Sequence, residues 1–356
     1  MRHHLLIRQV ICLSFILVLI TTSVYAQESD INIFERLEQA KTEFEEATQK
    51  LNPESILSLI TSNLTANIKK TSAYFCAAVS VILISSIFAS ISGEGSSGKV
   101  FDLVGDCCII CCIFPAIVLC FENAQEHIEA ICGFMISFIP VGAGLHAASG
   151  STFSAALLSG MGSGAISILQ VICASLILPL IKANCSIIAA NSLCKKVNLS
   201  GISSLLKSIS LWITGLYFTI FTGIITLSTT LQSSADNLAM KGIKYGAAKL
   251  IPIAGGLVSE SMKTVIASAA FIKSTTGATG IAFILYTLIP PLCLLLITKF
   301  EISILSAFSK AINSNSAASF LDSLNSCMNI LLALLISCSL AFIIMLSVFM
   351  KTNVTI

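Results

Sequence analysis

The stretch that decides the fold is Ser233–Gly280, with the sequence SSADNLAMKGIKYGAAKLIPIAGGLVSESMKTVIASAAFIKSTTGATG. It is basic and mildly polar, whereas the runs on both sides of it are long and apolar. At the helical period of 3.6 residues this stretch predicts two amphipathic helices. A hinge at Pro252, Gly255 and Gly256 separates them, because proline and glycine interrupt helices. Residues 232–280 are called the insert below.

The two predicted helices of the insert each have one apolar and one charged face. In the first, Met240, Ile243 and Leu250 share the apolar face, and lysines occupy the other. We expect the charged residues to dock an acidic partner or anionic lipid headgroups. These residues are Lys241, Lys244, Lys249, Glu260, Lys263 and Lys273. The alternative is a pair of amphipathic helices that only lies flat on the bilayer.

The composition is that of a membrane protein. Of the 356 residues, 55% are hydrophobic and 11% are charged, whereas soluble domains carry about 25% charged residues. A chain this apolar cannot hide its side chains in one core surrounded by water, so we expect an all-α, polytopic bundle. The net charge of +2 gives no basic patch for nucleic acid, which we exclude as a partner.

Two segments of different character precede the apolar runs. Residues 1–26 have a basic start, a short apolar core and a small-residue site ending at Ala26, which predict a cleavable signal peptide. An uncleaved anchor helix is the alternative. Residues 27–72 are acidic, and their apolar spacing predicts two extracytoplasmic amphipathic helices. These helices would contact the membrane or a partner, or merely cover the membrane domain.

The apolar runs predict seven membrane spans, five of them within 73–231 and two within 281–356. The predicted spans are 73–91, 100–121, 128–148, 155–181, 207–231, 281–300 and 327–350. An acidic loop at Glu122–Glu126 is expected after the second span, and an interfacial helix at 185–206. If the N-terminus lies outside, seven spans place the insert in the cytoplasm, as the positive-inside rule favours for its lysines.

Prolines and glycines predict breaks within several of these spans. Proline removes one backbone hydrogen bond and clashes with the preceding turn of a helix. The residues concerned are Pro115, Pro140, Pro179, Pro290 and Pro291, with glycines at 160, 162 and 164. Broken helices line a path or build a tight assembly interface in some membrane proteins; ordinary kinked packing is the alternative.

Few residues in the chain offer chemistry. Asp102 and Asp106 lie one turn apart at the start of the second span, and carboxylates within a membrane are typical of ion paths. A simple ion pair between Lys99 and Asp102 is the alternative. The cysteines of 107–112 have metal-binding spacing, but apolar surroundings make thiols inert, so we expect no metal. No catalytic or phosphate-loop motif is present, and we expect neither a cofactor nor enzymatic activity.

A set of short motifs follows the apolar segments in a fixed order. In the insert the motifs are Ala235-Asp236, Ile251-Pro252, Gly255, Val265, Ser268, Lys273 and the run Gly277 to Gly280. Outside it they are Ile139-Pro140, Ala148-Ser149-Gly150 and Ser154-Ala155-Ala156. In this order and spacing, and in its apolar segments from about Tyr74 to Met350, the chain resembles the stage III sporulation protein AE family of endospore-forming bacteria.

The resemblance implies a role in sporulation. A member of this family would be a multi-pass protein of the mother-cell membrane around the forespore. It would be the channel or export-gate component of a secretion-like complex that crosses the double membrane. Its partners would be the lipid bilayer and the other stage III AA to AH proteins, including the ATPase and the ring-forming members. The rival hypothesis rests on Asp102, Asp106 and the broken helices, and is a stand-alone secondary transporter of a small solute or ion.

Overall fold

The computed structural model describes residues 53–92, 96–148, 152–193, 198–250 and 255–350, and it describes the backbone alone over several stretches, of which 228–250 and 255–275 are the longest. The described residues are almost entirely helical and contain no strand. The elements are α3 (Pro53–Ser92), α4 (Ser96–Ala148), α5 (Thr152–Leu157), η1 (Leu158–Gly162), α6 (Ser163–Gln170), η2 (Val171–Ile177), α7 (Leu178–Leu193), α8 (Ser200–Leu250), α9 (Gly255–Ala311) and α10 (Asn315–Met350). The predicted all-α class is therefore confirmed.

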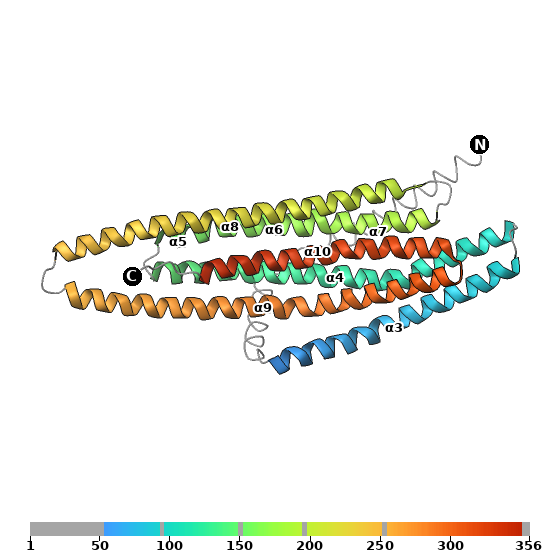
Figure 1. Ribbon diagram of the computed structural model, residues 1–356, viewed down its shortest axis with the longest axis horizontal. Helices are drawn as coiled ribbons and strands as arrows, with labels where there is room; N and C mark the ends of the chain where they lie inside the picture. Colours follow the sequence, from blue (N-terminus) through green and yellow to red (C-terminus); the bar gives the residue numbers. More distant parts are fainter. Residues whose placement is uncertain (1–52, 93–95, 149–151, 194–197, 251–254, 351–356) are drawn as a thin grey trace.

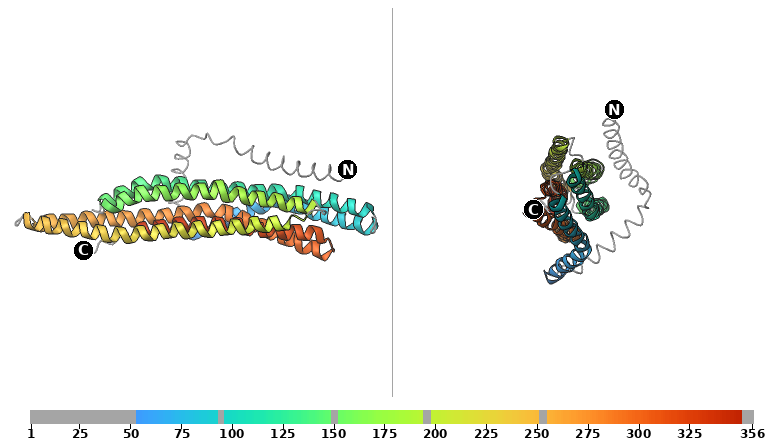
Figure 2. Two further views of the ribbon diagram at one scale, coloured as in Figure 1. Left: turned by 90° about the horizontal axis from the view of Figure 1, so that it is seen from above. Right: turned by 90° about the vertical axis from the view of Figure 1, so that its right-hand side faces the viewer.

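The long helices lie side by side and alternate in direction, so that the bundle is far longer than it is wide (Figures 1 and 2). Six stretches of helix among the described residues are long and apolar enough to cross a membrane. The sequence predicts seven spans, and the difference lies in α4. This single helix of 53 residues replaces the predicted spans 100–121 and 128–148 and the loop between them.

The acidic residues of α4 do not form a loop because the apolar stripe of the helix continues past them. Phe121, Ala124 and Ile128 are all buried, at a spacing of three and four residues that keeps them on one helical face. Glu122 and Glu126 fall on other faces of the same turns. The charge of this segment is therefore accommodated beside the core without interrupting the helix.

The central element is α10, which packs against α4, α7, α8 and α9. Figure 1 shows it between the α8 layer and α9. Its buried residues recur at three- and four-residue intervals over almost the whole helix, which is the pattern of a helix enclosed by several neighbours. They include Met328, Leu331, Leu335, Cys338, Phe342 and Leu346.

The turn between α9 and α10 reverses the chain within a few residues. Asn313 has a positive φ of 58°, a conformation that asparagine adopts more readily than most residues. The Ser314 amide donates to the Ser309 carbonyl at 2.9 Å, and the Asn313 amide donates to the Lys310 carbonyl at 3.1 Å. This pair of bonds is a Schellman motif, which satisfies the last carbonyls of α9.

The expected breaks at prolines are not where the helices are interrupted. Pro115 and Pro140 lie inside α4, and Pro290 and Pro291 lie inside α9, since buried apolar residues continue on both sides of each. The irregular segments are the π-helices η1 and η2. The first contains two of the predicted glycines, at 160 and 162, and the second immediately precedes α7, whose second residue is Pro179.

The predicted amphipathic segments are continuous with membrane helices. The first half of the insert is the end of α8, and the second half is the start of α9. Residues 185–206 do not form one interfacial helix, because α7 ends at Leu193 and α8 begins at Ser200. Residues 53–72 begin α3. The predicted signal peptide at 1–26 and residues 27–52 lie outside the described residues.

Candidate functional site

Five charge-free helical segments lie side by side at the same level of the bundle. They are 130–148 of α4, 154–181 of α5–α7, 208–227 of α8, 276–297 of α9 and 327–348 of α10. Ring contacts align four of these helices. The ring centroids of Phe134 on α4 and Phe283 on α9 are 4.7 Å apart, and those of Phe221 on α8 and Phe342 on α10 are 6.0 Å apart. Each segment has the length of about 20 residues that a bilayer core requires. This part is called the apolar slab below.

A belt of polar side chains borders one side of the apolar slab. Lys182 of α7 donates to the Gln125 side chain at 3.4 Å, and Gln125 donates to Glu129 at 3.1 Å. Thr71 of α3 donates to Glu301 of α9 at 2.7 Å. Charged and polar groups of this density are costly in hydrocarbon, and the belt marks the end of the apolar slab.

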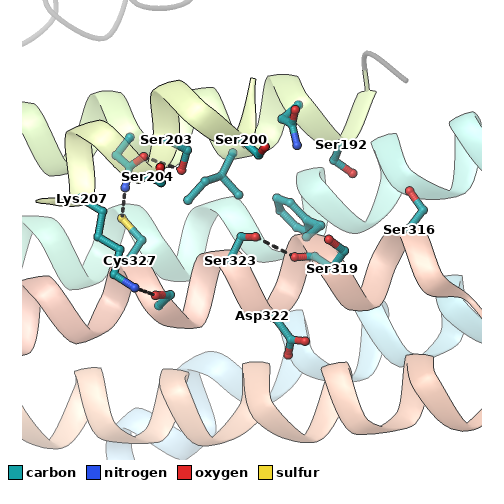
Figure 3. Close-up of a pocket in the computed structure, with 15 residues that line it drawn as sticks. Ser192, Ser200, Ser203, Ser204, Lys207, Ser316, Ser319, Asp322, Ser323 and Cys327 are labelled. Carbon is teal, nitrogen blue, oxygen red and sulfur yellow. Dashed lines mark hydrogen bonds between the residues drawn. The ribbon is translucent and has the colours of Figure 1, made fainter. Parts of the chain in front are cut away.

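Beyond the belt, the helices α7, α8 and α10 line a half-open cavity of about 450 Å³, whose wall carries many polar side chains. The helices α8 and α10 each present to it a row of serines at helical spacing, and Figure 3 shows these rows together with Ser192 of α7. The cavity is lined by Asn184, Ile188, Asn191, Ser192, Ser200, Ser203, Ser204, Lys207, Ser316, Ser319, Phe320, Asp322, Ser323, Ser326 and Cys327. It is called the serine pocket below.

Hydrogen bonds between helices hold the walls of the serine pocket together. Ser203 of α8 donates to the Asn184 side chain of α7 at 2.8 Å. The Lys207 ammonium of α8 donates to Ser326 of α10. The Leu199 amide, just before α8, donates to the Asn191 side chain at 2.7 Å. These bonds fix the three helices at the separation that leaves the cavity open.

The charged residues around the serine pocket differ in whether they form an ion pair. Asp322 accepts from Lys310 at 2.7 Å and from Ser306 at 2.5 Å, both on α9, and Figure 3 shows it directed away from the serines of α8. Lys207, in contrast, forms no ion pair with any carboxylate of the described residues. Apart from Ile188, Phe320, Cys327 and the paired Asp322, the pocket is lined by hydroxyl and amide groups and one ammonium. Such groups suit non-covalent recognition of a polar ligand.

The predicted pair Asp102 and Asp106 is only partly described. Asp106 is buried, with 5% of its surface exposed, and it accepts a hydrogen bond from Ser316 at 2.7 Å. Because Ser316 also lines the serine pocket, the structure places Asp106 directly behind the pocket wall. The side chain of Asp102 lies outside the described residues. Asp106 precedes the apolar slab by 24 residues of α4, or about 36 Å of helix.

The candidate residues of the insert lie at the opposite end of the bundle from the serine pocket (Figure 1). Lys241, Lys244 and Lys249 belong to α8, and Glu260, Lys263 and Lys273 belong to α9; their side chains lie outside the described part. For the hinge, α8 ends at Leu250 and α9 begins at Gly255, with Gly256 in its first turn. Pro252 lies between them, outside the described residues. The structure does not bring the insert and Asp106 together.

Sequence reasoning missed the serine pocket, although a signal was present. In α10, Ser316, Ser319, Ser323 and Ser326 recur at intervals of three and four residues. In α8, Ser200, Ser203, Ser204 and Lys207 do the same. Rows of this kind predict a polar helical face. The periodicity does not say which helices face one another, and the cavity exists only where the two rows meet α7.

Comparisons with known proteins place the chain in a family. The sequence profile described as stage III sporulation protein AE matches residues 36–353. The stage III sporulation protein AE of Bacillus subtilis (strain 168) is 22% identical over 225 residues, which are 63% of this chain and 56% of that relative. The match thus spans little more than half of the relative's length. No solved structure matches significantly. Since the family profile covers nearly the whole sequence, this multi-pass membrane protein belongs to the stage III sporulation protein AE family.

Proposed function

We propose that this chain is the channel or export-gate component of a transenvelope complex between the mother cell and the forespore. It would reside in the mother-cell membrane that surrounds the forespore. Membership of the stage III sporulation protein AE family supports a place in the stage III machinery. In this role the chain positions and admits other molecules, and we propose that it is not an enzyme and binds no cofactor.

The observation that carries this proposal is the reach of the insert beyond the apolar slab. The helix α8 continues from residue 227 to Leu250, which is about 35 Å at about 1.5 Å per residue. The helix α9 returns from Gly255 over a similar distance. Figure 1 shows both helices passing the ends of α4 and α10 on this side. A rigid helical projection of this length can contact a partner outside the membrane.

The insert is the part that we expect to contact the partners. These would be other stage III AA to AH proteins, above all the ATPase, with the ring-forming members around the membrane domain. Lys241, Lys244 and Lys249 lie within nine residues of one another on α8. Their positive charge would favour an acidic partner surface. Four of the six stretches that can cross a membrane precede the insert, so the insert lies on the side of the membrane where α3 begins. The cytoplasmic placement that the positive-inside rule favours for its lysines therefore requires α3 to begin in the cytoplasm.

Charge reversal tests the docking role. The triple variant Lys241→Glu, Lys244→Glu and Lys249→Glu should abolish pull-down of the ATPase partner and leave membrane insertion intact. The matched control is Lys69→Glu with Lys70→Glu, because these lysines are exposed on α3, away from the insert. Pull-down that survives the triple variant, or that the control also abolishes, would remove the docking proposal.

A second candidate function is that of a stand-alone secondary transporter, and the buried carboxylate Asp106 favours it. Ionisable groups enclosed in membrane proteins are typical of proton and ion paths. Purified protein in vesicles would then take up a small solute, and Asp106→Asn would abolish uptake while the protein remains folded. The distance of Asp106 from the apolar slab makes this the weaker candidate. Vesicles without uptake, or uptake that persists in Asp106→Asn, would eliminate it.

A further inference from the structure

We propose that the serine pocket binds a phosphate group, and that the source of this group is the headgroup of an anionic phospholipid. The site and its ligand are independent of the proposed channel function, because the pocket lies at the opposite end of the bundle from the insert (Figure 1).

The charge of the pocket favours an anion. Lys207 brings one ammonium into the wall, and none of the described carboxylates forms an ion pair with it. Of the two acids nearby, Asp322 is paired with the Lys310 ammonium at 2.7 Å, and Asp106, which accepts from Ser316 at 2.7 Å, is not among the lining residues. A cation would meet Lys207 without a free carboxylate to offset the repulsion. An anion would pair with Lys207 directly.

The hydrogen-bonding groups of the pocket match the oxygens of phosphate. The hydroxyls of Ser192, Ser319 and Ser326, the Asn191 amide nitrogen and the Lys207 ammonium line the cavity and can donate to phosphate oxygens. The hydroxyl hydrogens of Ser203, Ser316 and Ser323 are already donated within the protein. The Ser192 hydroxyl is buried and has no hydrogen-bond partner among the residues that the structure describes. A buried hydroxyl without a partner costs free energy, and a ligand oxygen in the pocket would remove that cost.

Two helix N-termini add to the positive potential at the same end. The helix α8 begins at Ser200 and α10 begins at Asn315, and the first turns of both helices contribute serines to the pocket wall. The N-terminal end of a helix carries a partial positive charge. In α8 the amides of Ser200 and Ile202 already donate to Asn198 and Leu199, so the contribution of this helix is its dipole. Both helices therefore favour an anion in the cavity between them.

The surface of α8 beside the pocket favours a lipid over a free phosphate. Lys207 is the last charged residue before the charge-free segment 208–227. One turn inside that segment, Leu211 lies on the same side of α8 as Lys207 and is exposed, and Trp212 next to it has 72% of its surface exposed. Tryptophan is enriched at the headgroup level of membranes. Acyl chains along this face of α8 would bring their own phosphate to the level of Lys207.

Lipid retention by the full-length protein tests the proposal. Protein purified in detergent would be mixed with phosphatidylglycerol or with phosphatidylcholine, and native mass spectrometry would count the lipids retained. We expect selective retention of phosphatidylglycerol, weakened about tenfold in Lys207→Gln, since one charge-assisted hydrogen bond is lost. Ser319 lines the cavity and is exposed, so the larger side chain of Ser319→Leu would occupy the cavity. This variant should weaken retention of phosphatidylglycerol without removing a charge.

The matched control is Lys299→Gln, a half-buried lysine of α9 that does not line the pocket. It should retain phosphatidylglycerol as the unmodified protein does. Equal losses in Lys207→Gln and Lys299→Gln would overturn the site, as would equal retention of the two lipids. In a second arm, millimolar inorganic phosphate is added to lipid-free protein. Lys207-dependent binding of phosphate there, with no selectivity between the lipids, would overturn the lipid as source.

Discussion

The helices α8 and α10 meet twice along their length, and the two meetings differ. Inside the apolar slab, Phe221 and Phe342 make an edge-to-face contact with ring centroids 6.0 Å apart. Beyond the belt, the same two helices face each other with serines and Lys207 around a cavity. One pair of helices is thus close-packed in one half and held apart by polar groups in the other.

The apolar slab and the serine pocket contribute differently to the protein. Close apolar packing stabilises through many small contacts, and any void in it is costly. A cavity with polar walls contributes little to packing and offers groups to a ligand. We therefore assign stability to the slab contacts of α10 and recognition to the serine pocket. Substitutions in the two halves should differ in what they damage.

The largest expected effect is at Phe342 in the slab. Its side chain is fully buried, with 0% of its surface exposed, and Phe342→Ala leaves a cavity between α8 and α10. A change of this kind costs about 3–5 kcal/mol of the free energy of unfolding. The measurement is reversible unfolding of the purified protein in detergent, followed by circular dichroism.

The control for Phe342→Ala is the same substitution at Phe300, which has 67% of its surface exposed. Phe300→Ala should change the free energy of unfolding much less, because little packing is lost. Retention of phosphatidylglycerol should survive in folded Phe342→Ala protein. Equal destabilisation by the two variants would contradict the assignment of stability to the slab.

Much of the fold follows from the sequence, because hydrophobicity and charge act locally. The charge-free segments within α8 and α10 are readable directly, and with them an all-α bundle of membrane helices. The division of α4 is not readable from charge alone, since Glu122 and Glu126 suggest a loop. The stripe of Phe121, Ala124 and Ile128 outweighs them, and its importance depends on neighbours that only the folded chain supplies.

The serine pocket is harder to predict than the bundle. Each serine row has helical spacing, but a polar helical face is most often solvated, and three faces must converge before a cavity forms. The convergence depends on the end of α7 at Leu193 and the start of α8 at Ser200. The sequence alone predicts a single interfacial helix over residues 185–206. Without the break between α7 and α8, the sequence does not indicate that three helices line the serine pocket.

A smaller effect is expected at Gly280, where three helices approach closely in the slab. A Cβ atom added there would lie 3.0 Å from a methyl group of Leu346 and 3.2 Å from the ring of Phe134. Gly280→Ala should therefore lower the free energy of unfolding by about 1 kcal/mol, as overpacking does.

At Gly223 of α8 the same added atom meets nothing within 4 Å. Gly223→Ala should raise the free energy of unfolding by about 0.5–1 kcal/mol, since alanine favours helix more than glycine does. Chemical unfolding of both variants under one condition measures the contrast. If the two substitutions shifted stability in the same direction, the packing of the slab would be looser than these contacts require.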